Sequence, residues 1–163
     1  MEKSQCYIGA PNGIVLCVDS AGSQELNAKF YHAYSRQPIE VCGMEQLLFE
    51  MECFFDSIHF PHPTTNDRFF HEIKQSVNQM GKKEKIMSDE ELLSKHGYQG
   101  TFIIRVQHRQ HSSWQGRITW MDQNKTVYFR SVWEMVKLMA NALNTVGGPE
   151  DGREEPEWPE DEV

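Results

Sequence analysis

Hydrophobic and polar residues alternate along two stretches of the chain, and each stretch predicts three short strands. The first stretch begins with Ile14, Leu16 and Val18, which are apolar at every second position. The second begins in the same way with Phe102 and Ile104. A period of two is typical of a strand with one buried face, so both stretches predict antiparallel sheet with one side on a core.

After each set of strands the apolar spacing changes to that of a helix. The apolar stripe of the first helix holds Leu47, Leu48, Met51, Phe54 and Phe55, and that of the second holds Val132, Val136, Met139 and Leu143. Such spacing places one apolar side of a helix against a core. Ser131 followed by Glu134 has the spacing of a capping box, which predicts where the second helix begins.

The two stretches align without a gap, residues 13–55 against residues 101–143, at a constant separation of 88 positions. Only Val18/Val106 and Met51/Met139 are identical, so the likeness is one of pattern. We interpret it as an internal repeat of one β-β-β-α unit. The alternative is that two such segments share a general pattern and nothing more.

The predicted fold class is α+β: two fused β-β-β-α repeats with antiparallel sheets, a helical insert between them and a disordered acidic tail. We expect the insert to hold a helix over 66–80, with Phe69 and Phe70 on its apolar side, and a short helix capped by Ser88. The expected boundaries are an N-terminal segment 1–12, a first unit 13–60, the insert 61–100, a second unit 101–146 and the tail 147–163.

Charge is distributed unevenly along the chain. The formal net charge is -8, but residues 147–163 hold eight acids and one base, a net of -7. The remaining residues are nearly neutral at -1, and residues 101–131 carry five bases and one acid, a local +4. The acidic total argues against a protein that coats DNA, whereas the local excess indicates a basic surface on the second unit.

Arginines of the second unit fall on the sheet face opposite the predicted core. The candidate binding residues are Arg105, Arg109, Arg117, Tyr128 and Arg130. Arginine suits forked contacts with carboxylate or phosphate. Three interpretations stay open: a solvated face, a face that docks an acidic protein or the chain's own tail, and a platform for single-stranded nucleic acid. Such platforms stack bases on several aromatics, and only Tyr128 points outward here.

No motif in the sequence indicates catalysis, so we expect a protein that is not an enzyme. The histidine spacings, such as His108 and His111, do not match a metal site, and we expect no metal and no cofactor. The four cysteines form no CxxC pair and are interpreted as reduced structural thiols of a cytoplasmic protein. No apolar run approaches the ~18 residues of a membrane span.

One string of the second unit resembles a known group of sequences. It combines Arg109-Gln110, Ser113-Trp114-Gln115-Gly116 and Trp120 with Phe129-Arg130-Ser131 before an apolar helix. The string resembles short, uncharacterised proteins from Gram-positive anaerobic bacteria with an RQxxSWQGxxTW-like core. The resemblance covers about residues 101–143. It implies a bacterial cytoplasmic protein with a small α+β fold and carries no activity with it.

The sequence therefore favours a non-catalytic binding or regulatory module of a bacterial cytoplasm whose partner is another protein. The arginine-bearing face is the expected contact, with the acidic tail as a second element. Alternatives are single-stranded nucleic acid or an anionic ligand on the same face, or a polyanionic inhibitor of a nucleic-acid-binding protein of phage or mobile-element type. No membrane contact is expected, and a homodimer through an exposed sheet edge stays open.

Overall fold

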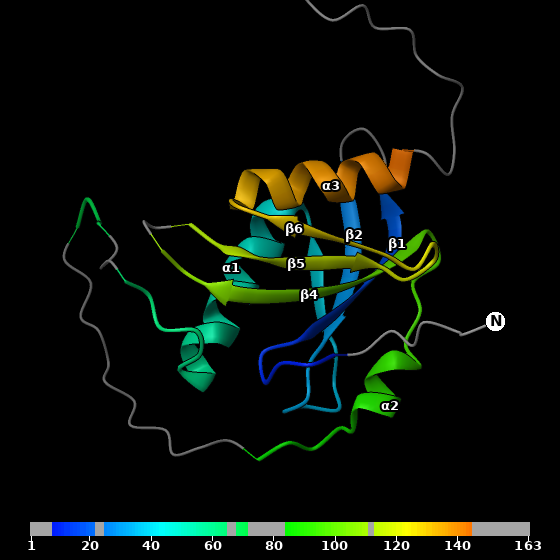
Figure 1. Cartoon of the computed structure of the whole chain (residues 1–163), viewed down its shortest axis with the longest axis horizontal. Coiled ribbons are helices and arrows are strands. Elements are labelled where there is room, and N and C mark those ends of the chain that lie inside the picture. Colours follow the sequence, from blue (N-terminus) through cyan, green and yellow to red (C-terminus); the bar gives the residue numbers. More distant parts are fainter. Residues whose placement is uncertain (1–7, 22–24, 65–67, 72–83, 111–112, 145–163) are drawn as a thin grey trace, which may run out of the picture.

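The computed structural model describes residues 8–21, 25–64, 68–71, 84–110 and 113–144. They form a six-stranded antiparallel sheet of order β3-β2-β1-β4-β5-β6, together with three helices (Figure 1). The elements are β1 (Ile14–Ala21), β2 (Leu26–Tyr31), β3 (Ile39–Cys42), α1 (Met44–Ile58), α2 (Asp89–Leu93), β4 (Gly100–His108), β5 (Gln115–Trp120), β6 (Lys125–Phe129) and α3 (Val132–Asn144). The predicted α+β class with antiparallel strands is confirmed.

One face of the sheet, which we call the helix face, packs against α1 and α3. Its core joins strand residues to helix residues, among them Ile14, Leu16, Phe102, Ile104, Leu47, Met51, Phe55, Met135 and Met139. Burying one such large apolar side chain contributes about 1.5–3 kcal/mol. The alternation in the strands and the stripes in the helices therefore meet in one core, and this core fixes the orientation of every strand.

The opposite face, which we call the outer face, is covered near its centre by described residues. Val15 and Ile103 of the two central strands pack there with Met87 and Leu92, and Ile8 adds a further contact. Leu92 belongs to α2, whose predicted cap is confirmed because the Ser88 hydroxyl accepts the Glu91 N–H at 3.3 Å. Toward the β6 edge the outer face becomes more exposed, since Thr119 of β5 is buried and Tyr128 of β6 is exposed.

The strand registers recur at a fixed distance along the chain. Five pairs between β1 and β2 have counterparts 88 residues later between β4 and β5, and three pairs between β2 and β3 have counterparts between β5 and β6. The irregularity between Val18 and Ser20 also recurs between Val106 and His108. At the junction of β1 and β4, Val15 pairs directly with Ile103.

Two predictions for the connecting segments have different outcomes. The helix expected over 66–80 is wrong where it can be described, because residues 68–71 are not helical. Phe69 and Phe70 are 54% and 106% exposed, so they bury no apolar side of the kind that stabilises a helix in a protein. The rest of that predicted helix and the acidic tail 147–163 lie outside the described residues.

Candidate functional site

Three of the predicted binding residues lie side by side on the outer face, one on each strand of the second half. Arg105 of β4 pairs directly with Arg117 of β5, and Arg117 pairs directly with Tyr128 of β6. We call these three residues the arginine row. The guanidinium carbon of Arg117 lies 4.5 Å from the centre of the Tyr128 ring, which is a cation–π contact.

Exposure increases along the arginine row toward the edge of the sheet. Arg105 is 8% exposed, Arg117 is half-buried and Tyr128 is 60% exposed. Two arginines directly opposite each other on adjacent strands repel, and this repulsion decreases when an anion lies over both. The row can therefore receive a carboxylate or phosphate group from the side of β6.

Polar atoms near the row are buried without hydrogen-bond partners among the described residues. They are Nε of Arg117, Oε1 of Gln115 and Oδ1 of Asn12. Asn12 is fully buried next to β4, where its amide nitrogen donates to the Val106 carbonyl at 2.7 Å. Most buried polar groups in proteins have partners, so these three atoms are exceptions within the part of the chain that the structure describes.

Arg130 lies at the junction between β6 and α3, where its side chain is 87% exposed. Its Nε and terminal nitrogen donate to one carboxylate oxygen of Glu134, at 3.3 and 3.1 Å. This hydrogen bond holds the pKa of Glu134 below its ordinary value. The Glu134 N–H donates to the Ser131 hydroxyl at 3.1 Å, which is the capping contact that the sequence pattern predicts at the start of α3.

Arg109 does not belong to this face, and its predicted position is wrong. Its side chain is 5% exposed and packs on the Phe55 ring of the helix face, 5.8 Å from the ring centre. Its Nε donates to the Pro61 carbonyl at 2.7 Å and its terminal nitrogen to the Asp56 carboxylate at 2.8 Å. The cause is the bulge between Val106 and His108, which reverses the alternation of faces.

No pattern in the sequence predicts that residues of segment 8–12 are buried against the sheet. Asn12 and Ile8 are both buried, although they precede the first strand and follow no alternating pattern. The bulge has only one signal in the sequence: the apolar alternation of β4 stops after Val106. A turn-forming Asn12-Gly13 pair predicts a bend but does not predict what the bend covers.

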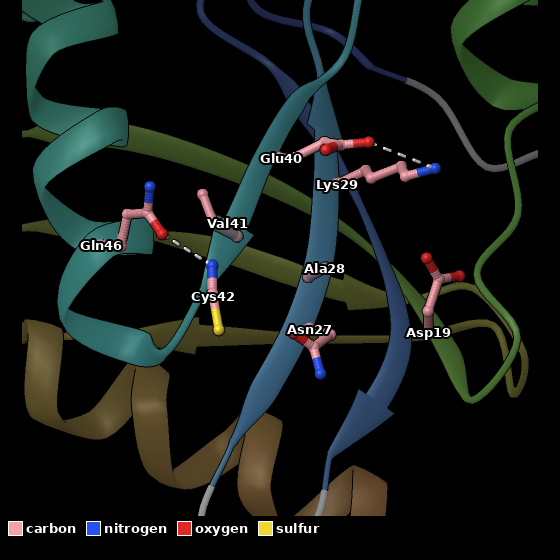
Figure 2. A pocket seen from close by; sticks show the side chains of 8 residues that line it. All are labelled: Asp19, Asn27, Ala28, Lys29, Glu40, Val41, Cys42 and Gln46. Carbon is pink, nitrogen blue, oxygen red and sulfur yellow. Dashed lines mark hydrogen bonds and ion pairs between the residues drawn. The ribbon is translucent and has the colours of Figure 1, made fainter.

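A hollow of about 310 Å³ lies on the outer face of the first half (Figure 2). Lys29 and Glu40 lie across from each other over it, with 3.7 Å between Nζ and the nearer carboxylate oxygen. At its α1 end the side chain of Gln46 accepts the Cys42 N–H at 2.8 Å. The hollow is also lined by Asp19, so acidic groups outnumber basic ones.

The hollow and the arginine row occupy matching positions in the two halves. Lys29 and Glu40 precede Arg117 and Tyr128 by 88 residues and make the equivalent direct pair. Cys17 precedes Arg105 by the same number. The first half therefore holds the Lys29–Glu40 ion pair where the second half holds Arg117 over the Tyr128 ring, directly paired with Arg105. This difference makes the second half the better candidate for binding an anion.

The thiols of Cys17 and Cys53 are poorly suited to nucleophilic chemistry. Burial, with the nearby Asp19 charge, raises the pKa of Cys17 from 9.0 to about 11. Burial and neighbouring acids also raise the pKa of Cys53. A thiolate is the reactive form, so both groups stay protonated and unreactive near neutral pH.

The chain has no significant match to a family model, to a curated protein or to a solved structure. In the part of the chain that the structure describes, no three His, Cys, Asp or Glu side chains come together as a metal site would require. Within the same residues, no helix is long and apolar enough to cross a membrane.

Proposed function

We propose that this chain is a non-catalytic binding module that holds an acidic segment of another protein on the outer face of its second half. The contacts are the arginine row and Arg130. The observation that carries the proposal is the direct pairing of Arg105 with Arg117, with Arg117 lying over Tyr128 at the open side of the sheet. Arginine forks suit carboxylates, and a partly buried site strengthens such contacts relative to water.

A protein partner fits this face better than single-stranded nucleic acid does. Nucleic-acid platforms expose several aromatic rings on which successive bases stack. On the outer face of β4–β6 Tyr128 is the exposed aromatic side chain among the described residues, and Arg117 already covers its ring. A nucleobase would need the free face of the Tyr128 ring for stacking, whereas a carboxylate binds the arginines without contacting the ring.

We also propose that the two β-β-β-α units are copies of one ancestral unit, as the alignment of the sequence suggests. The recurrence of strand pairs and of the bulge at a separation of 88 residues supports it. A cytoplasmic location is part of the same proposal and is supported by the buried free thiol of Cys17. After duplication, one outer face kept the Lys29–Glu40 ion pair and the other became basic.

The acidic segment 147–163 is expected to affect binding through its charge. With a net of -7 it competes with any acidic partner for the arginine row. Deleting residues 147–163 is expected to raise the affinity for an acidic peptide most at low salt. No change in affinity would mean that this segment acts only on solubility, and a selective gain in nucleic-acid binding would favour the alternative function.

The proposed function is tested by titrating a labelled oligo-glutamate peptide with the full chain, with fluorescence anisotropy of the peptide as the readout. Arg117→Ala is expected to weaken binding about tenfold, because one charge-assisted contact contributes about 1.5 kcal/mol or more. Lys29→Ala is the matched control at the equivalent position and is expected to leave affinity unchanged. Equal losses in both variants, or tighter binding of oligothymidylate of similar length, would overturn the proposal.

A further inference from the structure

The outer edge of β6 is open to a further strand. β6 is the last strand of the sheet and pairs with β5 on one side only. Four of its five residues, from Lys125 to Tyr128, are exposed, so no described residue covers this edge. An uncovered edge presents backbone donors and acceptors to any extended chain that approaches it.

A backbone hydrogen bond between the adjoining ends of β4 and β5 determines which groups of β6 point outward. The Met121 N–H donates to the Thr101 carbonyl at 2.9 Å, so residues 117 and 119 of β5 direct their backbone groups toward β4. Their neighbours on β5 then direct theirs toward β6. By this alternation Thr126 and Tyr128 direct their N–H and C=O groups away from the sheet, at the open edge.

The other edge of the sheet is less open. On β3 the outward N–H of Cys42 is already taken by the side chain of Gln46 at 2.8 Å. β3 is also shorter, with four residues against five, and Pro38 stands directly before it. Strand addition therefore favours β6 over β3.

The basic side chains near the β6 edge favour an acidic strand as the occupant. Lys125 lies at one end and Arg130 just beyond the other, and Arg117 lies one strand inward on the outer face. A second copy of this chain, paired antiparallel through β6, would bring Lys125 of one copy near Arg130 of the other, which is unfavourable. An acidic strand meets opposite charges instead.

We infer that the acidic partner binds by adding an extended strand to β6, a mode that rests on the proposed function. Partner residues opposite Thr126 and Tyr128 carry acidic side chains on the outer face, within reach of Arg117 and Arg130. The alternate partner residues lie on the helix face against Val127, which is 43% exposed, and are apolar. Backbone hydrogen bonds supply affinity, and the alternating side chains supply specificity.

The chain's own acidic segment is a poor occupant for this edge. Pro149, Pro156 and Pro159 fall within or next to its acidic runs, and proline has no N–H to donate to a strand. The inferred occupant is therefore an extended acidic segment of another protein.

The test uses a synthetic peptide of alternating Glu and Val and two methylated forms of it. In the inferred register the Glu N–H groups point toward β6 and the Val N–H groups point away. N-methylation at Glu is expected to weaken binding to the full chain about tenfold or more, because at least two hydrogen bonds are lost. N-methylation at Val is the matched control and is expected to change affinity little.

A second readout comes from amide hydrogen exchange in the protein. Exchange at Thr126 and Tyr128 is expected to slow when the unmethylated peptide is added, whereas Val127, already directed toward β5, changes little. If both methylated peptides bind alike while Arg117→Ala still weakens them, strand addition is wrong and the proposed function stands. If the peptide does not bind, or binds without regard to Arg117, both are wrong.

Discussion

The guanidinium of Arg109 donates to the carboxylate of Asp56 across 2.8 Å, although 53 residues separate the two in the sequence. This contact joins the end of β4 to the last turn of α1. The same guanidinium donates to the Pro61 carbonyl, so it also fixes the chain as it leaves the helix. Arg109 is thus a structural residue, and its neighbours depend on it for their hydrogen bonds.

Arg109→Ala is expected to lower the free energy of unfolding by about 2–3 kcal/mol, because a buried carbonyl loses a charged donor. Asp56→Asn is expected to cost less, about 0.5–1 kcal/mol, since the Asp56 side chain is 63% exposed. Urea unfolding followed by tryptophan fluorescence measures both. An Arg109→Ala loss no larger than that of Asp56→Asn would contradict this assignment.

Gly116 of β5 lies against the backbone of Arg105 and Val106, next to the bulge of β4. A Cβ at this position would collide with the carbonyl oxygen of Arg105. Gly116→Ala is therefore expected to destabilise the fold by about 1–3 kcal/mol in thermal or urea unfolding. The matched control is Ala28→Gly at the equivalent position of β2, with an expected cost of about 0.5–1 kcal/mol. A Gly116→Ala protein as stable as the wild type would refute the close approach.

The raised pKa of Cys17 predicts that the fold loses stability in alkaline solution. Its pKa is about 11 in the fold against 9.0 for an unperturbed thiol, so the folded state favours the protonated form. Its contribution is complete below pH about 9 and decreases as the pH rises toward 11. The difference in unfolding free energy between wild type and Cys17→Ala, measured across this range, isolates the thiol from other titrating groups. Parallel pH profiles for the two proteins would contradict the burial argument.

Glu134 restrains Arg130, and releasing it should favour the acidic partner. The Glu134 carboxylate is ionised at neutral pH, where it holds the guanidinium, and this contact lowers the pKa of Glu134. Glu134→Gln is expected to raise affinity for the Glu/Val peptide about two- to threefold, the range of an exposed ion pair. Glu50→Gln on α1 removes the same charge away from the site. An equal gain in both variants would show an effect of net charge alone.

Sequence patterns predicted the elements well where apolar residues repeat with a clear period. The alternation from Ile14 to Val18 and the capping pattern at Ser131 both correspond to observed elements. The segment around Phe69 and Phe70 shows the limit of the same reasoning. Its helical period is present, but both rings are exposed, so among the described residues they bury no apolar surface that would stabilise a helix.

The site was only partly predictable, because it depends on register and on one extra residue. Alternation correctly placed Arg105, Arg117 and Tyr128 on one face, but the direct pairing of the three needed the strand registers. The bulge that turns Arg109 to the other face breaks the period of two without a distinct residue pattern. The burial of Arg105 could not be read from its own strand either.

The pairing of Val15 with Ile103 has a consequence for how the chain folds. Both residues are fully buried at the centre of the sheet, so separating the halves would expose the largely buried strands β1 and β4 to water. The halves are therefore expected to unfold in a single cooperative transition rather than one after the other. Cut within the connecting segment 61–100, the two fragments would each be insoluble or unfolded alone and would regain structure by complementing one another.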